Sequence, residues 1–440
     1  MLPAYISQAK SNPPSNRAPW YVNTAPSYAG VFLWIAFYQT MAQGTIDRAG
    51  LGVCIAALAA AALICYALFY YVPGLLGMKT GFPLYVVGSS TFGTTGGYAL
   101  PGLFMGLLQV GWFAVGTFFS TKYILTGLGL DATPGTALFW TVAAIWTYVM
   151  ATIGILGIGY VAKASLFLNA IPFFMILVVF LQVKDGIGSH QVTNPNNWGA
   201  FTTILQTVIG FFATAGAAGV DFGMNSRDER DVRMGGLVGI AGAILYAGGL
   251  PLLSVAGARA LDPSITSFSY DAVISSIGGV MATAMFFLFA LASIVPACFC
   301  AFIAGNSFST MLPGVSRSLS TLVGVTVALL LAGTGVAADL GSVFGLVGAS
   351  FGPICGAMVA DYLLSGRKWA GPRQGINWAG YGAWAVGFIV GISPQLGLDL
   401  PLHPLALASF AVGFIVYVLL AKAGLQPATV ASTQAEAVAR

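Results

Sequence analysis

Two side chains with complementary recognition chemistry, Gln109 and Trp112, lie three residues apart in the middle of a long apolar stretch. Residues at this spacing share one face of a helix, so both point toward the same neighbour. An indole ring offers a flat stacking surface, and a carboxamide offers both a hydrogen-bond donor and an acceptor. The pair therefore predicts a site for a planar heterocycle with donors and acceptors on its edge, such as a nucleobase. A tryptophan packed on small core residues is the alternative that the residues leave open.

A glycine-rich stretch at residues 210–219 is the second candidate. Its glycines, hydroxyl and aromatic residues are Gly210, Gly216, Gly219, Thr214, Phe211 and Phe212. Glycine lets the backbone leave helical geometry at little steric cost, and broken membrane helices free backbone groups for ligands and ions. We therefore expect a helix break here, with the two phenylalanines beside it; close helix packing is the alternative. The corresponding break in the first apolar stretch falls at residues 37–40 by position alone.

Two carboxylates end apolar stretches. Asp221 precedes a charged loop at residues 227–233, and Asp361 ends a later stretch. An ionised carboxylate within a membrane is costly and often functional. Because Asp221 falls near the membrane boundary, we interpret it as a gate or a local ion pair in preference to a proton site. Asp361 is interpreted in the same way.

Charge is scarce over the whole chain. The 440 residues include 17 Lys and Arg and 13 Asp and Glu, which is 7% charged against 58% hydrophobic, with a mean hydropathy of +0.87. Soluble domains carry about 25% charged residues. The composition predicts an all-α integral membrane protein in a lipid bilayer, and it excludes nucleic-acid binding because no basic stripe exists. The five cysteines lie in apolar runs without metal-ligand partners, so no cofactor is expected.

The apolar stretches predict about twelve transmembrane helices. They lie near residues 27–46, 50–72, 99–123, 137–159, 162–183, 200–222, 235–258, 277–304, 318–334, 341–364, 376–392 and 404–422. Two polar-flanked segments, 82–92 and 264–274, are expected to be short surface or re-entrant helices before the third and eighth spans.

The basic residues predict the orientation. With an even number of spans both termini share one side, and of the 17 basic residues only Arg48, Lys122, Lys184 and Arg259 then fall on the other side. Cytoplasmic loops carry the excess of Lys and Arg. The tails 1–26 and 423–440 are therefore expected in the cytoplasm, with the protein in the inner (cytoplasmic) membrane.

The spans also repeat. Residues 27–183 and 200–364 each contain five spans at matching spacing, with the two short segments at the same offset. Five is an odd number, so the second copy must insert upside down, as in secondary transporters whose substrate site lies where the repeats meet. Residues 376–422 would add two C-terminal helices. Chance spacing of hydrophobic segments is the alternative.

Short motifs along most of the chain resemble one known family. They are Gly77-Met78-Lys79-Thr80-Gly81, Leu100-Pro101-Gly102, Gln109-Val110-Gly111-Trp112-Phe113, Ala215-Gly216, Val220-Asp221-Phe222, Gly356-Ala357-Met358-Val359-Ala360-Asp361-Tyr362 and Asn377-Trp378. In this order the chain resembles the nucleobase:cation symporter family, in its purine/cytosine permease branch. The resemblance implies a leucine-transporter-like fold of twelve helices, ten of them in a five-plus-five inverted repeat.

The same resemblance implies roles for individual residues. Trp112 and Phe212 would sandwich the base, and Gln109 and Thr214 would bond its edge. Backbone groups from Phe211 through Ala213 to Thr214 would contribute.

One departure from the family concerns the coupling ion. The eighth-helix stretch at residues 291–299 lacks the family's paired hydroxyls and asparagines, and only Ser293 offers a side-chain oxygen for sodium. Pro296 could free a further carbonyl. Proton coupling through Asp221, or uncoupled transport, thus remains an alternative to sodium, and the loss of the asparagines leaves the exact substrate open.

Together these features favour a secondary transporter of a small planar molecule. The segment around Asp271 is expected to contribute to an outer gate. The main rival is a transporter of the same fold for an amino acid or a hydantoin- or allantoin-like ring. A channel would need a continuous polar pore, and a membrane enzyme would need clustered acids, bases or metal ligands at depth. Oligomeric state and direction of transport are not determined by the sequence.

Overall fold

The computed structural model describes residues 2–32, 35–156, 165, 167–312 and 314–430, and the described chain is helical throughout its regular elements. The α-helices are α1 (Ala4–Ser7), α2 (Thr24–Phe32), α3 (Ile35–Thr40), α4 (Leu51–Ile64), α5 (Tyr71–Thr80), α6 (Leu84–Gly127), α7 (Ala137–Leu156), α9 (Ala170–Val183), α10 (Asn197–Ala217), α11 (Gly219–Gly223), α12 (Glu229–Gly236), α13 (Ala243–Leu261), α14 (Tyr270–Ile277), α15 (Gly279–Ala292), α16 (Ile294–Met311), α17 (Arg317–Gly333), α18 (Leu340–Leu364), α19 (Trp378–Gly391) and α20 (Leu405–Lys422).

Nine stretches of the described residues are helices long and apolar enough to cross a membrane. They include two continuous runs in which a π-helical segment joins neighbours: Cys65–Tyr70 joins α4 to α5, and Leu237–Gly242 joins α12 to α13. The chain is therefore an all-helical membrane protein, as predicted. The start of the predicted span 162–183 and the tail residues 431–440 lie outside the described residues.

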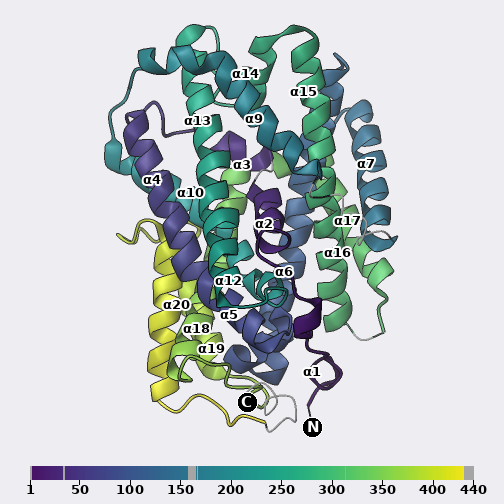
Figure 1. Cartoon of the computed structure of the whole chain (residues 1–440), viewed down its shortest axis with the longest axis vertical. Helices are drawn as coiled ribbons and strands as arrows, with labels where there is room; N and C mark the ends of the chain where they lie inside the picture. Colours follow the sequence, from purple (N-terminus) through teal and green to yellow (C-terminus); the bar gives the residue numbers. More distant parts are fainter. Residues whose placement is uncertain (1, 33–34, 157–164, 166, 313, 431–440) are drawn as a thin grey trace.

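The helices pack side by side into one elongated bundle (Figure 1). The long helix α6 passes through it, and α2 and α3 lie near its centre. Helices α18, α19 and α20 pack together on one side, and α7 and α17 lie on the other. Helices α1 and α14 lie at opposite ends of the bundle.

Both short segments predicted before spans three and eight are separated from those spans by a glycine. In the run from Leu84 to Gly127, Gly93 has φ 86° and ψ 169°, so residues 84–92 form a short helix of their own. Gly278 has φ 70° and ψ −179° between α14 and α15. Only glycine adopts this region readily. At Gly93 a side chain would also collide with the carbonyl of Gly375.

The helix breaks differ from their predicted positions. Helix α10 continues to Ala217, and the interruption lies at Ala218, the far end of the predicted stretch 210–219. Residues 37–40 are helical within α3, which ends at Thr40 and is followed by turns, so the helix ends at the far end of this predicted stretch as well. The reason is packing: a side chain on Gly348 of α18 would approach the Gly210 Cα to 3.0 Å, so Gly210 serves a close helix contact.

Candidate functional site

Trp112 lies at the centre of the predicted site, on α6, and its ring meets α10. The ring centroids of Trp112 and Phe211 are 4.7 Å apart, with the rings inclined at 65° in an edge-to-face contact. Trp112 is 6% exposed and Phe211 2%. Edge-to-face pairs at this distance are favourable beyond the apolar area they bury. Phe211 also lies 4.9 Å from Phe37 of α3, so three helices meet at this aromatic cluster.

Phe212, the next residue of α10, packs against an aromatic residue of another helix. Successive residues of a helix are separated by about 100° around its axis. The ring of Phe212 lies edge-on to Phe69, at 6.4 Å between centroids, while Phe211 meets Trp112. Phe211 is thus an α10 ring that the structure places against Trp112, and the sandwich of a base between Trp112 and Phe212 stays a prediction.

Gln109 lies one turn before Trp112 and is buried, at 8% exposure. Its Nε2 lies 3.5 Å from the sulfur of Met105, a weak acceptor in the same helix. Among the described residues this thioether is the one hydrogen-bond partner of the Gln109 amide, which keeps most of its hydrogen-bonding capacity for the predicted ligand.

Thr214 and Ala213 follow the phenylalanines on α10. The Thr214 hydroxyl is buried and has no hydrogen-bond partner within the described part of the chain. The carbonyl of Ala213 lies 3.7 Å from the thiol of Cys355 on α18, which donates weakly to it. An unpaired buried hydroxyl costs free energy unless something else satisfies it. Thr214 is thus the side chain of this group that is most available to a ligand.

Asp221 was predicted to be a gate or to form a local ion pair; it pairs with no cation among the described residues, and the gating role stays a prediction. Its Oδ1 accepts the backbone N–H of Leu84 at 3.0 Å, which ties α11 to the first residue of α6. Carboxylates are favourable at helix N-termini because the free N–H groups and the helix dipole point at them. The nearby ion pair joins Arg227 to Asp231, with Nε 2.7 Å from Oδ2, and this hydrogen bond raises the pKa of Arg227.

Ser293 is the single residue between α15 and α16, and it is 1% exposed. Its hydroxyl donates to the Phe289 carbonyl at 3.0 Å, which leaves the oxygen lone pairs as its only remaining capacity. Among the residues that the structure describes, no three His, Cys, Asp or Glu side chains cluster as metal ligands would.

At the end of the bundle that carries α14, α6 and α14 are joined by an ion pair. Lys122 Nζ lies 2.8 Å from Asp271 Oδ2, with the side chains 30% and 19% exposed. Below it, Tyr270 of α14 contacts Tyr38 at 5.5 Å and Phe289 at 6.0 Å between ring centroids. These rings bury one another, so the segment around Asp271 covers the central cluster from the α14 end of the bundle.

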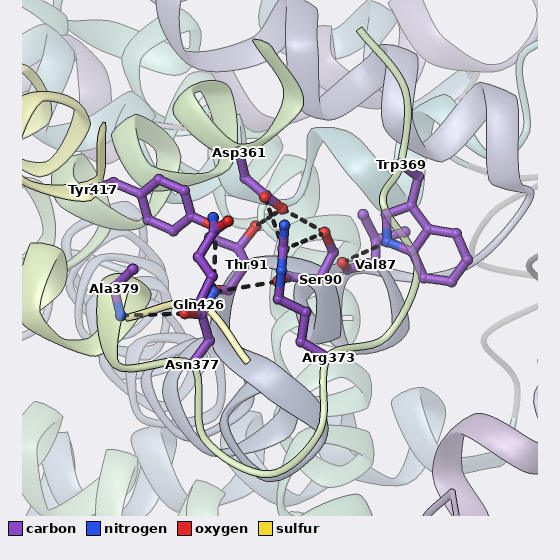
Figure 2. Close-up of polar contacts among 10 residues, drawn as sticks. All are labelled: Val87, Ser90, Thr91, Asp361, Trp369, Arg373, Asn377, Ala379, Tyr417 and Gln426. Carbon is purple, nitrogen blue, oxygen red and sulfur yellow. Dashed lines mark hydrogen bonds and ion pairs between the residues drawn. The ribbon is translucent and has the colours of Figure 1, made fainter. Parts of the chain in front are cut away.

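A buried polar network fixes the other end (Figure 2). Asp361 of α18 pairs with Arg373, Nη1 to Oδ1 at 2.8 Å, and accepts the hydroxyls of Ser90 and Thr91. Arg373 also donates to the Ser90 carbonyl. Asp361 thus forms the local ion pair predicted for it.

Asn377 and the C-terminal segment extend this network (Figure 2). Asn377 Nδ2 donates to the carbonyl of Thr91 at 2.8 Å and reaches the Tyr417 hydroxyl at 3.3 Å. Gln426 donates to the same hydroxyl at 2.9 Å. The short helix at residues 84–92 is therefore bound to α18, α19 and α20. No local sequence pattern indicated Arg373 or Tyr417, since their partners are distant in the chain.

The N-terminal segment folds over the same end of the bundle. The Tyr5 hydroxyl donates to the Thr94 carbonyl at 2.6 Å, and Arg17 donates to the Met78 carbonyl at 2.7 Å. Asn12 donates to the carbonyl of Met224 at 3.1 Å. This segment, expected only as a tail, therefore packs against the ends of α5, α6 and α11.

The chain is 27% identical over 331 residues to the cytosine permeases of Escherichia coli O157:H7 and Escherichia coli strain K12. The match covers 72% of this chain and 73% of each relative. The chain resembles the nucleobase:cation symporters, as its motifs predicted. No family model matches it. These relatives are permeases, in agreement with the expectation of a transporter and not an enzyme.

Solved structures extend the similarity to the fold. Mhp1, a nucleobase-cation-symport-1 family transporter, aligns with a TM-score of 0.73 in a closed conformation with bromovinylhydantoin bound, at 18% identity over 94% of both chains. Its inward-facing conformation aligns with a TM-score of 0.76, also at 18% identity, over 99% of this chain and 98% of that one. A Na+-coupled sialic acid symporter aligns at 0.65 with 12% identity, over 98% of this chain and 96% of that one. The chain has the fold of these transporters.

Proposed function

We propose that this protein is a secondary transporter that imports a nucleobase, or a similarly planar heterocycle, across the cytoplasmic membrane by alternating access. The observation that carries the proposal is the buried contact of Trp112 with Phe211, one turn from Gln109, in a chain similar to cytosine permeases. Aromatic and amide groups recognise a neutral planar ring with a polar edge. The substrate is thus expected to be small, uncharged and flat.

The contact between Trp112 and Phe211 sets a condition for binding. Optimal contact between carbon atoms is about 3.5–4 Å, so a ring held between two others needs them roughly 7 Å apart. The present separation is 4.7 Å. We infer that the substrate stacks on Trp112 and pushes the Phe211 ring away from it. Phe211 would then cover the other face of the substrate, the role that the family resemblance gives to Phe212. Phe212 would then support α10 through its contact with Phe69.

Hydrogen bonds to the substrate edge are assigned to Gln109 and Thr214. The Gln109 amide holds only a weak acceptor, and the Thr214 hydroxyl lacks a partner among the described residues. A buried polar group that only a ligand satisfies discriminates strongly against molecules that cannot bond to it. Ala213 lies between Phe211 and Thr214 along α10, and its backbone would face the same ligand.

Two paired features support an inverted repeat over residues 27–183 and 200–364. Gly93 and Gly278 share a positive φ with an extended ψ, each between a short helix and a long one. The second long helix of each half contains a π-helical segment, at Cys65–Tyr70 and Leu237–Gly242. Matched irregularities at corresponding positions are expected of duplicated units. Residues 376–422 lie beyond the pair as two added helices.

We propose the orientation from the distribution of the charges. We place the end of the bundle that carries the N-terminal segment and residues 423–430 in the cytoplasm, because the basic residues gather there. The ion pair of Lys122 with Asp271 then faces outside. Substrate would enter from the Asp271 side and leave beside Asp221.

We propose cation coupling with two candidate ions. Ser293 could give a sodium ion one hydroxyl oxygen. Because Pro296 has no N–H to donate to the carbonyl of Ala292, that carbonyl could be the second ligand. Asp221 could carry a proton instead. The ion would bind at one of these places at the same time as the substrate and make its movement dependent on the ion gradient.

Uptake into vesicles containing the purified protein tests the proposed function. We expect saturable uptake of labelled cytosine or another nucleobase, and its loss in Trp112→Ala while the protein remains folded. Hydantoins are the second substrate class to compare, since Mhp1 binds bromovinylhydantoin in its structure. Amino acids are the third. Saturable uptake of amino acids alone would contradict the proposal and favour a transporter of the same fold with a different substrate.

A further inference from the structure

The inner end of α10 has an unusual hydrogen-bond partner. The hydroxyl of Tyr28, on α2, donates to the carbonyl of Ala215 at 3.1 Å. Ala215 lies within the last turn of α10, which ends at Ala217. The last carbonyls of a helix lack intrahelical donors and need partners from elsewhere. Tyr28 supplies one of them at the break between α10 and α11.

The ring of Tyr28 also contacts the other side of the break. Its centroid lies 4.2 Å from that of Phe222, on α11. A side chain on Gly219, the first residue of α11, would place its Cβ 3.3 Å from the Tyr28 hydroxyl oxygen. Tyr28 is 0% exposed and packs edge-on against Tyr70 at 5.1 Å. One side chain therefore binds α10 through its hydroxyl and α11 through its ring.

Helix α11 is held separately from α10. A side chain on Gly77 of α5 would collide with the Val220 carbonyl, and one on Gly223 would collide with the Gly74 carbonyl. Backbones this close leave α11 in direct contact with α5. Both halves around Ala218 therefore pack on the continuous helix 51–80: α10 contacts α4 and the segment Cys65–Tyr70, and α11 contacts α5. Only α10 also packs closely on α18. Tyr28 joins the two halves directly.

We propose that Tyr28 is a positioning residue that sets the angle between α10 and α11 during transport. Its hydroxyl holds the Ala215 carbonyl while its ring holds Phe222, so movement of α11 relative to α10 must break one of the two contacts. Because Phe211 and Thr214 lie within two turns of the break, the angle also places the proposed substrate contacts. This inference rests on the proposed alternating-access function, and it concerns a residue that touches neither substrate nor ion.

Labelling of an introduced cysteine tests this role without any substrate. The five native cysteines are buried, so Met224→Cys, just after α11, can be labelled in the otherwise native chain in detergent. Tyr28→Phe removes only the hydroxyl. We expect it to raise the labelling rate by roughly two- to tenfold, the range of one hydrogen bond's net contribution. In vesicles the same change should alter the maximal uptake rate while leaving KM for the substrate within about twofold.

Tyr246→Phe is the matched control, because the Tyr246 hydroxyl donates to the Phe173 carbonyl at 2.7 Å between α13 and α9, away from the break. It should leave labelling of Met224→Cys unchanged. Gly219→Ala, whose methyl group would lie 2.9 Å from the Tyr70 ring and 3.3 Å from the Tyr28 hydroxyl, should also raise labelling. Equal labelling in all variants, or an equal rise in Tyr246→Phe, would overturn the role of Tyr28. If Tyr28→Phe raised the labelling rate but the native protein took up no nucleobase, the proposed substrate would be wrong and the positioning role of Tyr28 would stand.

Discussion

Arg373 and Asp361 form an ion pair with both side chains almost fully buried, Nη1 to Oδ1 at 2.8 Å and 7% and 5% of the side chains exposed. The pair joins the loop before α19 to the end of α18 and encloses the hydroxyls of Ser90 and Thr91 (Figure 2). Only 7% of the residues in this chain are charged, and this pair places two of them together in the interior. It binds the short helix 84–92 to the C-terminal helices.

Breaking this pair from one side should destabilise the protein strongly. Arg373→Ala leaves the Asp361 carboxylate buried without its cation, which typically costs about 3–5 kcal/mol. Thermal unfolding in detergent should show a clear fall in Tm. The double variant Arg373→Met with Asp361→Leu should recover part of the loss, since replacing a buried pair by apolar residues is often neutral. A Tm unchanged in Arg373→Ala would contradict the structural role of the pair.

The two phenylalanines of α10 should behave differently. Phe211→Ala removes the ring that contacts Trp112, so we expect weaker substrate binding by about tenfold or more, given aromatic truncation costs in well-packed sites. Phe212→Ala should act mainly through stability, because its ring packs on Phe69. Equilibrium binding of labelled nucleobase, read beside Tm, separates the effects. If Phe212→Ala weakened binding and Phe211→Ala affected only Tm, the result would favour Phe212 as the ring that stacks on the base opposite Trp112.

Thr214→Val tests the unpaired hydroxyl by an isosteric change. Since the hydroxyl has no partner within the described residues, its removal should leave Tm unchanged or slightly raised. If the hydroxyl bonds to substrate, affinity should fall by about tenfold. Thr117→Val, in α6, is the control, because that hydroxyl is also buried and unpaired but is not part of the proposed site. Equal affinity in wild type and Thr214→Val would remove Thr214 from the site.

The outer ion pair should be weak and sensitive to salt. Lys122 and Asp271 remain partly exposed, and pairs of this kind contribute about 1 kcal/mol or less. Lys122→Gln should make the outer side easier to open and raise the labelling rate of a cysteine placed at Ser275 by no more than about fivefold. Adding Asp271→Asn should then have little further effect. Additive effects of the two changes would show that the ion pair does not act as a unit.

Ion replacement distinguishes the two coupling sites. If sodium binds at Ser293, Ser293→Ala should weaken the sodium dependence of uptake and leave its pH dependence intact. If Asp221 carries the proton, Asp221→Asn should abolish uptake driven by a pH gradient while leaving exchange of substrate across the membrane. Vesicle uptake with each gradient collapsed in turn gives the readout. Full uptake without either gradient would rule out symport by both routes.

Composition and hydrophobic pattern were sufficient for the membrane class, most helix positions and the short segments before the third and eighth spans. Lipid imposes this regularity, because every backbone polar group within the bilayer must be satisfied inside a helix. The charge pattern predicted that Asp361 pairs locally, and the motifs predicted the family resemblance. These properties depend on residue type and local spacing, which the sequence contains directly.

Which groups meet across helices was decided by the tertiary structure. The contact of Trp112 with Phe211, the break at Ala218 and the bond from Leu84 to Asp221 each depend on how neighbouring helices are rotated and how closely their backbones approach. A glycine permits a break and a close contact equally well, so only the packing partner decides between them. For the same reason Tyr28 and Arg373 carried no signal in the sequence. Their roles come from partners at distances of 187 and 12 residues along the chain.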